Sequence, residues 1–326
     1  MEETRSEPSR SAAFAGLELI AADGPLIVTT QHGLGDTVLA RAAIRELLKW
    51  RRDVSVVTGW PQLWLDILPA ERIISRGSVF RDAERNLSRF RELERPAARG
   101  TERALSYMAR FWEMIRLRRS MLACTLAAVG ASSGDVSIDP ARFEAAGRAE
   151  AAAAGLDVDR PFVIVRYPTL RAECFCESRN PAPDLMAAAA RAIVRVAEPL
   201  VSVCSVAPTK EWFTEREALR PADLRLDAGE LSPEAYWWLL SRARVVVTPN
   251  ANPVLLAPAM GGRAFCVFGG AVPPEVVLDK NVGPGRVDFV APDPFCACFD
   301  PYHHCRRAID VELVAARARA FSESCP

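Results

Sequence analysis

The sequence lacks a surplus of charge of either sign. Its 41 lysine and arginine residues balance 41 aspartate and glutamate residues, so the formal net charge is zero. A neutral chain has no overall field that attracts polyanions, and no nucleic-acid-binding motif is present. The composition therefore argues against a nucleic-acid enzyme. Lysine is scarce too, occurring only at Lys49, Lys210 and Lys280, so arginine, which binds phosphate and carboxylate groups in a bidentate way, supplies nearly all the positive charge.

Long apolar runs are absent as well. The apolar segment 121–129 is much shorter than the roughly 18 residues that a membrane-spanning helix needs. Residues 1–20 begin with polar and charged positions rather than with the pattern of a signal peptide, and we expect them to form a disordered tail. We therefore expect a cytoplasmic protein without a transmembrane segment, and we leave open a peripheral contact at the inner face of the membrane.

Length and pattern predict two α/β domains. A chain of 326 residues suits two cores of about 150 residues each. Short apolar segments alternate with amphipathic ones, which is typical of doubly wound parallel sheets. The expected strands are 25–30, 53–56, 162–165, 200–205, 245–247 and 264–268, and the expected helices are 37–51, most of 78–130, 141–154, 184–196, one starting at 232–233, and 253–260. A junction near residue 155 separates a first Rossmann-like domain, 21–155, from a second, 156–326.

The first candidate loop is His32-Gly33-Leu34-Gly35-Asp36-Thr37, which follows the first expected strand. Ligands of doubly wound sheets bind at the carboxyl ends of strands, and the glycines let a backbone approach a ligand closely. A dinucleotide-binding fingerprint needs a third glycine where this chain has Val38, which argues against a Rossmann dehydrogenase. Asp36 is either a helix N-cap, which the local pattern favours, or a base that faces the cleft.

The second candidate loop joins the strand 245–247 to the helix 253–260. It contains Asn250, Ala251 and Asn252, directly before the helix start. Backbone N–H groups at a helix start suit a diphosphate, whereas asparagines also suit any tight turn. The loop alone therefore leaves both interpretations open.

These loops belong to a wider pattern that resembles a known family. The pattern consists of Gly33 to Leu39, the segment Arg179-Asn180-Pro181, the run from Asp227 to Asn250, and a cysteine-bearing tail from Cys296 to the helix after Asp310. In order and spacing it is similar to glycosyltransferase family nine, the heptosyltransferase group of lipopolysaccharide synthesis. The resemblance implies the GT-B fold, in which two Rossmann-like domains face each other across a cleft.

The resemblance also implies an activity and its residues. It implies inverting, metal-independent transfer of a heptose or hexose from a nucleoside-diphosphate sugar, with ADP-heptose as one candidate, to a hydroxyl of a bacterial glycan or glycolipid. Asp36 matches the family's proposed catalytic base, and Arg179 stands where the family has a phosphate-binding lysine. The cleft loop would contribute His32, Gly33, Gly35 and Thr37, and the donor site would contribute Arg179, Lys210, Gly229, Glu230, Asn250, Ala251 and Asn252.

The donor loop departs from the family pattern. The family usually has Asp-Thr-Gly, two further residues and then His, and here the matching positions are Asn250, Ala251, Asn252 and Leu255. This departure keeps a second hypothesis open, namely a catalytically inactive protein of the same fold that binds nucleotide sugars or acts as a scaffold. A nucleotide-sugar epimerase ranks lower, because it needs more acid–base groups than the sequence offers.

Two clusters have competing interpretations. Cys296, Cys298, His303 and Cys305, with His304, Cys174 and Cys176 nearby, are potential ligands of zinc or iron. The one-residue gap between Cys296 and Cys298 is not usual for structural zinc, so we favour reduced thiols, as we do for Cys204 and Cys266 in apolar segments. The arginine-rich stretch 103–119 is either a solvated helix face or an acceptor-binding surface.

Overall fold

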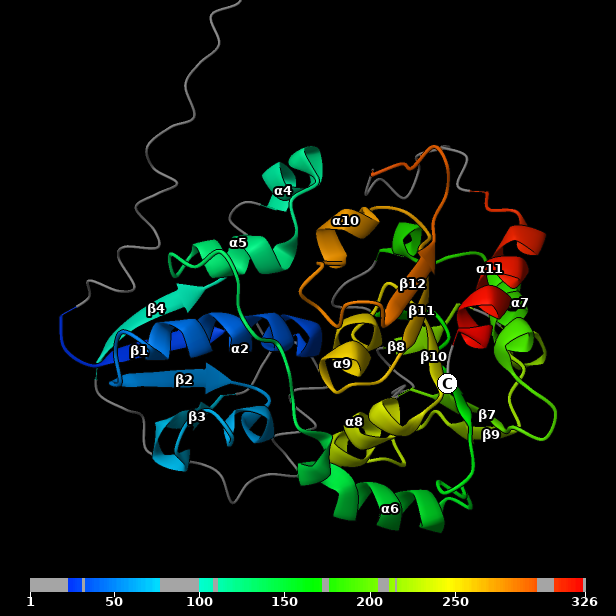
Figure 1. Ribbon diagram of the computed structural model, residues 1–326, viewed down its shortest axis with the longest axis horizontal. Helices are drawn as coiled ribbons and strands as arrows, with labels where there is room; N and C mark the ends of the chain where they lie inside the picture. The colour runs from blue at the N-terminus through cyan, green and yellow to red at the C-terminus, as the bar shows by residue number, and fades with distance from the viewer. Residues whose placement is uncertain are drawn as a thin grey trace, which may run out of the picture.

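The computed structural model describes residues 23–30, 33–76, 100–107, 111–171, 176–204, 211–214, 216–297 and 308–324. The predicted tail 1–20 lies outside the described residues. So do several predicted site residues, which are His32, Cys174, Lys210, Cys298, His303, His304 and Cys305. Element labels below are those of Figure 1.

The first half is built on a parallel four-stranded sheet with the order β3-β2-β1-β4. Its strands are β1 (Leu26–Thr30), β2 (Val54–Thr58), β3 (Ile73–Ser75) and β4 (Thr101–Leu105). Its helices are α2 (Leu34–Leu48), α4 (Phe111–Leu117) and α5 (Met121–Ala127), with short 3-10 turns η1 (Pro61–Trp64) and η2 (Ala70–Arg72). Helix α2 packs between this sheet and α5. Ten of its fifteen residues are therefore buried.

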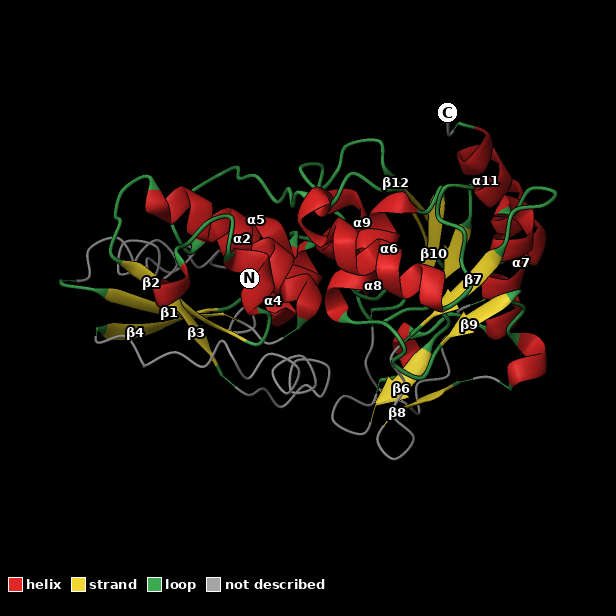
Figure 2. Ribbon diagram, turned by 90° about the horizontal axis from the view of Figure 1, so that it is seen from below, coloured by secondary structure: helices red, strands yellow, loops and turns green. Residues whose placement is uncertain are grey.

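The second half is built on a parallel six-stranded sheet with the order β12-β11-β10-β5-β7-β9. Its strands are β5 (Val163–Val165), β7 (Leu200–Val203), β9 (Leu224–Leu226), β10 (Val245–Pro249), β11 (Ala264–Val267) and β12 (Val287–Val290). A separate antiparallel pair, β6 (Thr169–Arg171) and β8 (Glu211–Phe213), projects from the sheet (Figure 2). All contacts within the six-stranded sheet are parallel, so the predicted α/β class with two parallel sheets is confirmed.

Helices cover both faces of the second sheet. Its helices are α6 (Glu144–Ala153), α7 (Pro183–Ile193), α8 (Pro233–Arg242), α9 (Pro253–Ala259), α10 (Pro274–Val277) and α11 (Val311–Glu323), with 3-10 turns η5 (Pro140–Phe143), η6 (Glu177–Arg179) and η7 (Glu217–Leu219). Helices α7 and α11 lie together at the outer side of the molecule (Figure 1), while α8 and α9 face the first half. Both faces of the parallel strands are therefore buried, which explains their continuous apolar sequences.

Local sequence signals explain several helix ends. Ser232 caps α8 by accepting a hydrogen bond from the N–H of Ala235, and Pro233 occupies the first turn, as predicted. Gly155 follows α6 with φ of +80°, in the left-handed region that favours glycine. The predicted start of α8 and the predicted end of α6 are thus confirmed, whereas α6 begins at Glu144 rather than at residue 141, because residues 140–143 form the 3-10 turn η5.

Two expectations near the first candidate loop were wrong. Helix α2 begins at Leu34 rather than near Thr37, so Asp36 lies inside its first turn. The stretch 78–130 is not helical throughout, because residues 101–105 form β4 and pair with β1. Only Leu105 of this strand is buried, so its sequence carries no apolar strand pattern. Pairing with β1 overrides the local helical preference.

The two halves share one continuous core. Trp237 of α8 packs edge-on against Trp60 of the first half and against Phe143 of η5, with ring centroids 6.0 and 5.2 Å away. The N–H of Ile138 donates to the carbonyl oxygen of Ala259 at 2.8 Å. The junction is therefore a packed interface that places the ends of α2 and α9 together.

Candidate active site

Asp36 is the third residue of α2. The N-cap of this helix is Gly33, whose backbone is extended and which forms no side-chain cap, so the interpretation of Asp36 as the N-cap is wrong. A carboxylate in the first turn still interacts favourably with the helix dipole. Its position at the carboxyl end of β1 is where ligands of such sheets bind.

Tyr107 holds the Asp36 carboxylate. Its hydroxyl donates a hydrogen bond to Asp36 Oδ1 at 2.5 Å. Burial, followed by the negative charge of Asp36, holds the pKa of the Tyr107 hydroxyl well above its usual value, while the positive charge of Arg179 acts in the opposite direction. Asp36, Tyr107 and Arg179 thus share one electrostatic environment, although Arg179 comes from the other half. Tyr107 was not predicted as a site residue, because the segment around it was expected to be helical.

Arg179 and Asn250 form the second part of the site. Arg179 ends η6, and its Nη2 donates to the carbonyl oxygen of Asn250 at 2.9 Å. Asn250 is 8% exposed, and its Nδ2 has no hydrogen-bond partner among the described residues, nor has Nε of Arg179. A buried donor without an acceptor costs about 1–3 kcal/mol. These two donors, one on the amide of Asn250 and one on the guanidinium of Arg179, suit a ligand that is rich in oxygen acceptors.

The start of α9 offers fewer free amides than its loop pattern predicts. Pro253 has no N–H group, and the N–H groups of Val254, Leu255 and Leu256 donate to the carbonyl oxygens of Ala251 and Asn252. Asn252 is the N-cap residue but makes no side-chain cap. Its Oδ1 instead accepts a hydrogen bond from the hydroxyl of Tyr236 on α8, at 2.9 Å. Side chains rather than helix-start amides therefore shape this loop.

The two predicted loops meet at the junction of the halves. A Cβ atom on Gly35 would lie 3.4 Å from Leu255 Cδ1 and 3.8 Å from Asn252 Cα, so α2 approaches the Asn250 to Asn252 loop closely. A Cβ atom on Gly33 would collide with Oδ2 of Asp36. Thr37 is buried, and its hydroxyl donates to the carbonyl oxygen of Gly33 at 3.1 Å. Gly33, Gly35 and Thr37 thus fix the shape of the loop.

Gly229 and Glu230 lie further along the same edge of the second sheet. They follow β9, which is three strands from β10 and therefore about 14 Å from it at the usual strand spacing. Gly229 has φ of +86° and needs the freedom of glycine. The exposed Glu230 carboxylate accepts from the N–H of Ala228 at 2.9 Å. Gly229 and Glu230 therefore lie at the same edge of the second sheet as Asn250, and a ligand as long as a nucleotide sugar could reach from one to the other.

Gly269 is a further residue that our sequence analysis missed. It follows β11, and a Cβ atom there would collide with the backbone of Arg179 and Asn180. The absence of a side chain at Gly269 therefore lets the segment that carries Arg179 approach β11. A glycine in a loop after an apolar strand was the available sequence signal, but its close partner is remote in sequence.

The described cysteines do not form a metal site. Within the described ranges, no three His, Cys, Asp or Glu side chains lie close enough together to hold a metal ion. Cys296 lines a cavity of about 900 Å³ between residues 293–297 and 308–310, and Cys176 contacts the Ser178 hydroxyl. Cys204 and Cys266 are buried, as their apolar segments predicted, and burial raises the pKa of the Cys266 thiol well above its usual value. Cys298, His303 and Cys305 lie outside the described residues. Whether they bind a metal ion together with Cys296 therefore stays untested.

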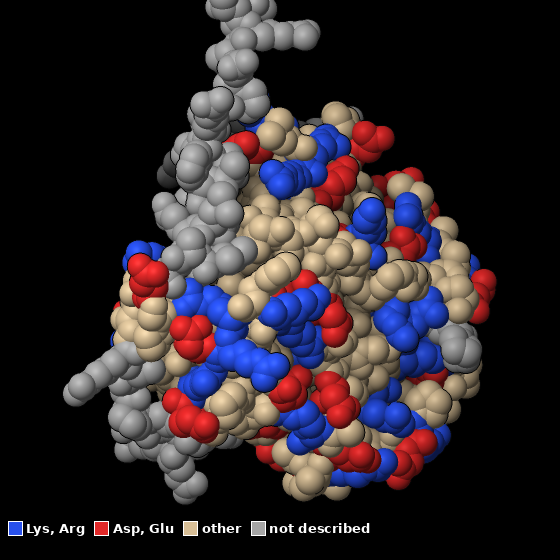
Figure 3. Space-filling view, turned by 60° about the vertical axis from the view of Figure 1, so that its left-hand side comes forward, with Lys and Arg blue, Asp and Glu red and all other residues tan. Residues whose placement is uncertain are grey.

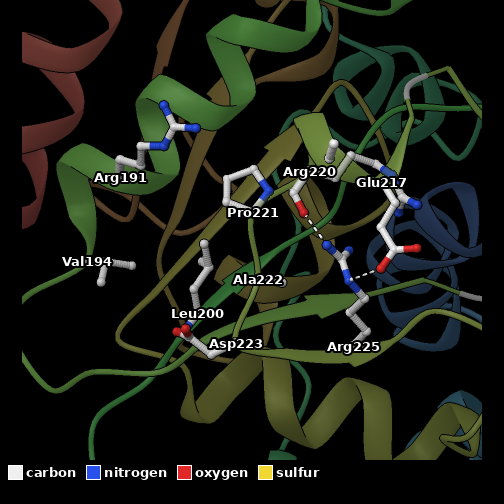
Figure 4. A pocket seen from close by; sticks show the side chains of 10 residues that line it. Arg191, Val194, Leu200, Glu217, Arg220, Pro221, Ala222, Asp223 and Arg225 are labelled. Carbon is white, nitrogen blue, oxygen red and sulfur yellow. Dashed lines mark hydrogen bonds and ion pairs between the residues drawn. The ribbon is translucent and has the colours of Figure 1, made fainter.

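Another cavity lies beside β7 and β9, away from the predicted residues. Its volume is about 710 Å³, and Arg191, Arg220 and Arg225 stand on its wall with Glu217 and Asp223 (Figure 4). Arg225 pairs with Glu217, and Arg220 pairs with Asp227. Charges of both signs are thus balanced there, and none of the predicted site residues lines this cavity.

Charge is mixed on the surface of the first half. Basic and acidic side chains are interspersed on the face shown in Figure 3. Arg103 lies on β4 rather than on a helix, which corrects part of the predicted helical arginine stretch. Arg118 forms an ion pair of 3.0 Å with Glu275 of the second half. Among the described helices, none has both the length and the apolar character to cross a bilayer.

Comparison with known proteins gives structural matches alone. No protein-family model and no curated protein sequence matches the chain. The glycosyl transferase family 9 protein of Veillonella parvula matches with a TM-score of 0.59 and 12% identity, over 95% of this chain and 99% of that one. The ADP-heptose LPS heptosyltransferase II of E. coli matches with a TM-score of 0.56 and 10% identity, over 92% of this chain and 99% of that one.

A third match is TibC of enterotoxigenic E. coli, an iron-containing dodecameric glycosyltransferase. Its TM-score is 0.57 at 13% identity, over 93% of this chain and 80% of that one. TibC is also known in complex with ADP-D-beta-D-heptose, in a structure that matches with a TM-score of 0.50. At such identities the likeness shows the fold. The chain has the GT-B fold of the family-nine glycosyltransferases, as the sequence resemblance predicted.

Proposed function

We propose that this protein transfers a sugar from a nucleoside-diphosphate sugar to a hydroxyl group of a glycan or glycolipid. The observation that carries the proposal is the convergence of Asp36 and Arg179 from opposite halves, since Tyr107 binds the first and feels the charge of the second. A carboxylate facing a cationic group across a domain junction is the pairing that base-assisted displacement of an anionic leaving group requires.

In this mechanism, Asp36 takes the proton of the acceptor hydroxyl while the hydroxyl oxygen attacks the anomeric carbon of the donor sugar. The bond from that carbon to the diphosphate breaks, and the departing diphosphate gains negative charge. Arg179 and the amide of Asn250 stabilise this charge, because both have buried N–H donors without acceptors. A single displacement of this kind inverts the anomeric configuration.

The proposed donor is a nucleoside-diphosphate heptose or hexose, with ADP-heptose as the first candidate. Support comes from TibC, a structurally similar protein that binds ADP-D-beta-D-heptose. In this proposal, Arg179 supplies the positive charge for the diphosphate, and the transfer is metal-independent. Gly229 and Glu230 border the space for the rest of the donor, and the resemblance adds Lys210 to this group.

The proposed acceptor binds on the side of the first half. Helix α4 presents Trp112, which is 66% exposed, and Arg116, one helical turn later on the same side. An exposed indole beside a guanidinium suits a glycolipid head group at a membrane surface. The protein would then work at the inner face of the membrane of a bacterial cell.

A second candidate function is nucleotide-sugar binding without catalysis. It is favoured by one observation, which is that Leu255 replaces the family's histidine and packs directly against Gly35. Leu255 therefore gives an apolar contact at the position where the family's histidine would bind the nucleotide sugar. The two functions differ in turnover but share ligand binding.

The test is a thermal-shift panel of ADP, UDP, GDP and their sugars with wild-type protein and Arg179→Ala. We expect one nucleotide to stabilise the wild type, by about 2.7 kcal/mol at a hundredfold excess over its Kd. Arg179→Ala should lose this shift, whereas Arg191→Ala, which removes an arginine from the other cavity, should keep it. The absence of a shift with every compound would exclude both candidate functions, and a shift without nucleotide release would favour the second.

A further inference from the structure

Tyr107 reaches Asp36 because two neighbouring strands end at the same edge of the first sheet. Strands β1 and β4 pair in parallel, with Thr30 opposite Leu105. The chain after β1 turns at Gly33 into α2, and the chain after β4 reaches Tyr107 two residues beyond its end. The contact between Tyr107 and Asp36 is therefore set by the sheet rather than by a chance meeting of loops.

The Asp36 carboxylate is held on two sides. Oδ1 accepts a hydrogen bond from the Tyr107 hydroxyl at 2.5 Å. Oδ2 lies over the Cα atom of Gly33, so closely that a Cβ atom there would collide with it. The turn at Gly33 is fixed in turn by Thr37, whose N–H and hydroxyl both bind the Gly33 carbonyl oxygen. The hydrogen bond from Tyr107 and the tight turn at Gly33 thus limit the orientations that the carboxylate can adopt.

We propose that Tyr107 is a positioning residue for the base, which keeps the Asp36 carboxylate in the orientation that receives the acceptor proton. The inference rests on the function proposed above, in which Asp36 is that base. Tyr107 keeps its own proton throughout, since it donates a hydrogen bond and does not take part in the displacement. Misplacement of a catalytic group by about 1 Å costs as much as a hundredfold in rate, which gives such a contact a large effect.

The electrostatics of the site support a neutral Tyr107. Burial and the nearby Asp36 charge raise the pKa of its hydroxyl, so that the hydroxyl stays protonated at neutral pH. Arg179 opposes this shift from the donor side. The phenol thus keeps its proton and donates it in the hydrogen bond to Asp36.

Tyr167 provides a matched control. It is buried in the second half, and its hydroxyl donates to the carbonyl oxygen of Pro221 at 2.6 Å. Both tyrosines pack against the core. Tyr107→Phe and Tyr167→Phe each remove a hydroxyl group and the hydrogen bond that it donates. Only the first change removes a contact with Asp36.

The first experiment needs no substrate. We would measure melting temperatures of wild type, Tyr107→Phe, Asp36→Ala and the double variant. Tyr107→Phe should lower the melting temperature of the wild type by about 2–4 °C, and should lower that of Asp36→Ala much less, because the bond is already gone. Equal losses in both backgrounds would show that the two side chains do not interact, and would overturn the proposal.

The second experiment measures ADP release from ADP-heptose, or nucleotide release from whichever nucleotide sugar the thermal-shift panel identifies, with a lipopolysaccharide-type glycolipid hydroxyl or water taking the sugar. Tyr107→Phe should lower kcat at least tenfold and leave the donor KM within about twofold. The acid limb of kcat/KM should move to higher pH, because a carboxylate that loses a donated hydrogen bond holds its proton more tightly. Tyr167→Phe should change neither kcat nor the pH profile.

The two experiments separate the two proposals. If the wild type releases no nucleotide from any sugar donor, the proposed function fails, and the melting temperatures alone decide whether Tyr107 holds Asp36. If the wild type is active and Tyr107→Phe keeps kcat within twofold with an unchanged pH profile, Tyr107 has a packing role only and the positioning proposal is overturned.

Discussion

At the scale of single residues, the proposed site depends on one carboxylate with two possible roles. Asp36 lies in the first turn of α2, where a negative charge favours the helix, and it accepts a hydrogen bond from Tyr107 at the place where the proposed function needs a base. A loss of activity on removing it is therefore informative only if folding is preserved. The replacement must keep the shape and the hydrogen bond while removing the charge.

Asp36→Asn meets this requirement. Its side-chain oxygen still accepts from Tyr107, so we expect the variant to fold and to keep the nucleotide-induced thermal shift. Turnover should fall by a factor of about 10² to 10⁴, the usual contribution of a general base. The measurement is nucleotide release under saturating donor, together with the melting temperature. Activity within tenfold of wild type would show that Asp36 has only its helix-stabilising role.

At the scale of secondary-structure elements, Asp66 ties α2 to the segment that connects the two halves. Arg41 of α2 is fully buried and binds Asp66 through two hydrogen bonds of 3.0 and 2.8 Å. Arg142 of η5 binds the same carboxylate at 2.8 Å. Burial opposes ionisation of Asp66, but the hydrogen bond and charge of Arg41 outweigh it and hold its pKa below the usual value.

Asp66→Asn should destabilise the protein by about 3–5 kcal/mol at pH 7, because a buried guanidinium loses its charged partner. The folded-state pKa is lowered, so the contribution of Asp66 is present above its unfolded pKa and is lost as pH falls through the acid range. Denaturant unfolding at pH 7 and in that range measures this difference.

The matched control is Asp53→Asn. Asp53 is half exposed in its pair with Arg51, so the cost should stay under about 1 kcal/mol. Equal costs for Asp53→Asn and Asp66→Asn would contradict a structural role for the buried cluster.

Strands with a continuous apolar sequence could be predicted. Strands that form only because they hydrogen-bond to a neighbouring strand could not. The strands β1, β5, β7, β10 and β11 are nearly fully buried, so their apolar runs identify them in the sequence. β4 has only Leu105 buried, and it is a strand because β1 lies beside it. The strands β3, β6, β8, β9 and β12 were not predicted either, because segments of three or four residues show little periodicity.

The same distinction applies to the site. The sequence resemblance pointed to Asp36, Arg179 and the Asn250 to Asn252 loop, and the structure brings these residues to one junction. Tyr107 was not predicted, because its contact with Asp36 exists only through the pairing of β4 with β1. A contact between residues far apart in the chain leaves no local pattern, and the roles of all these residues stay predictions.

At the scale of the whole molecule, the fold persists where sequence identity has nearly vanished. The structural matches share 10 to 13% identity with this chain and cover more than nine tenths of it. Such a fold depends on alternating buried strands and covering helices, which many sequences satisfy. The site depends on a few specific side chains, so it diverges independently, as the loop at Asn250 to Asn252 does.

The continuous core predicts that both halves unfold together. Interfaces between domains of one chain are often small and polar, which allows independent unfolding. Here Trp237 is fully buried between Trp60 of the first half and Phe143 of the connecting segment. We therefore expect one calorimetric transition, with calorimetric and van't Hoff enthalpies that agree.

Trp237→Ala should lower stability by about 3–5 kcal/mol and separate the transition into two, because it removes the side chain of the second half that packs against Trp60 of the first half. Trp112→Ala, at an exposed position on α4, is the control and should leave a single transition at nearly the wild-type temperature. Two transitions already in the wild type would mean that the halves are energetically independent. Asp36 and Arg179 would then meet only when a ligand draws the halves together, whereas a single transition means that the folded junction itself keeps them in place.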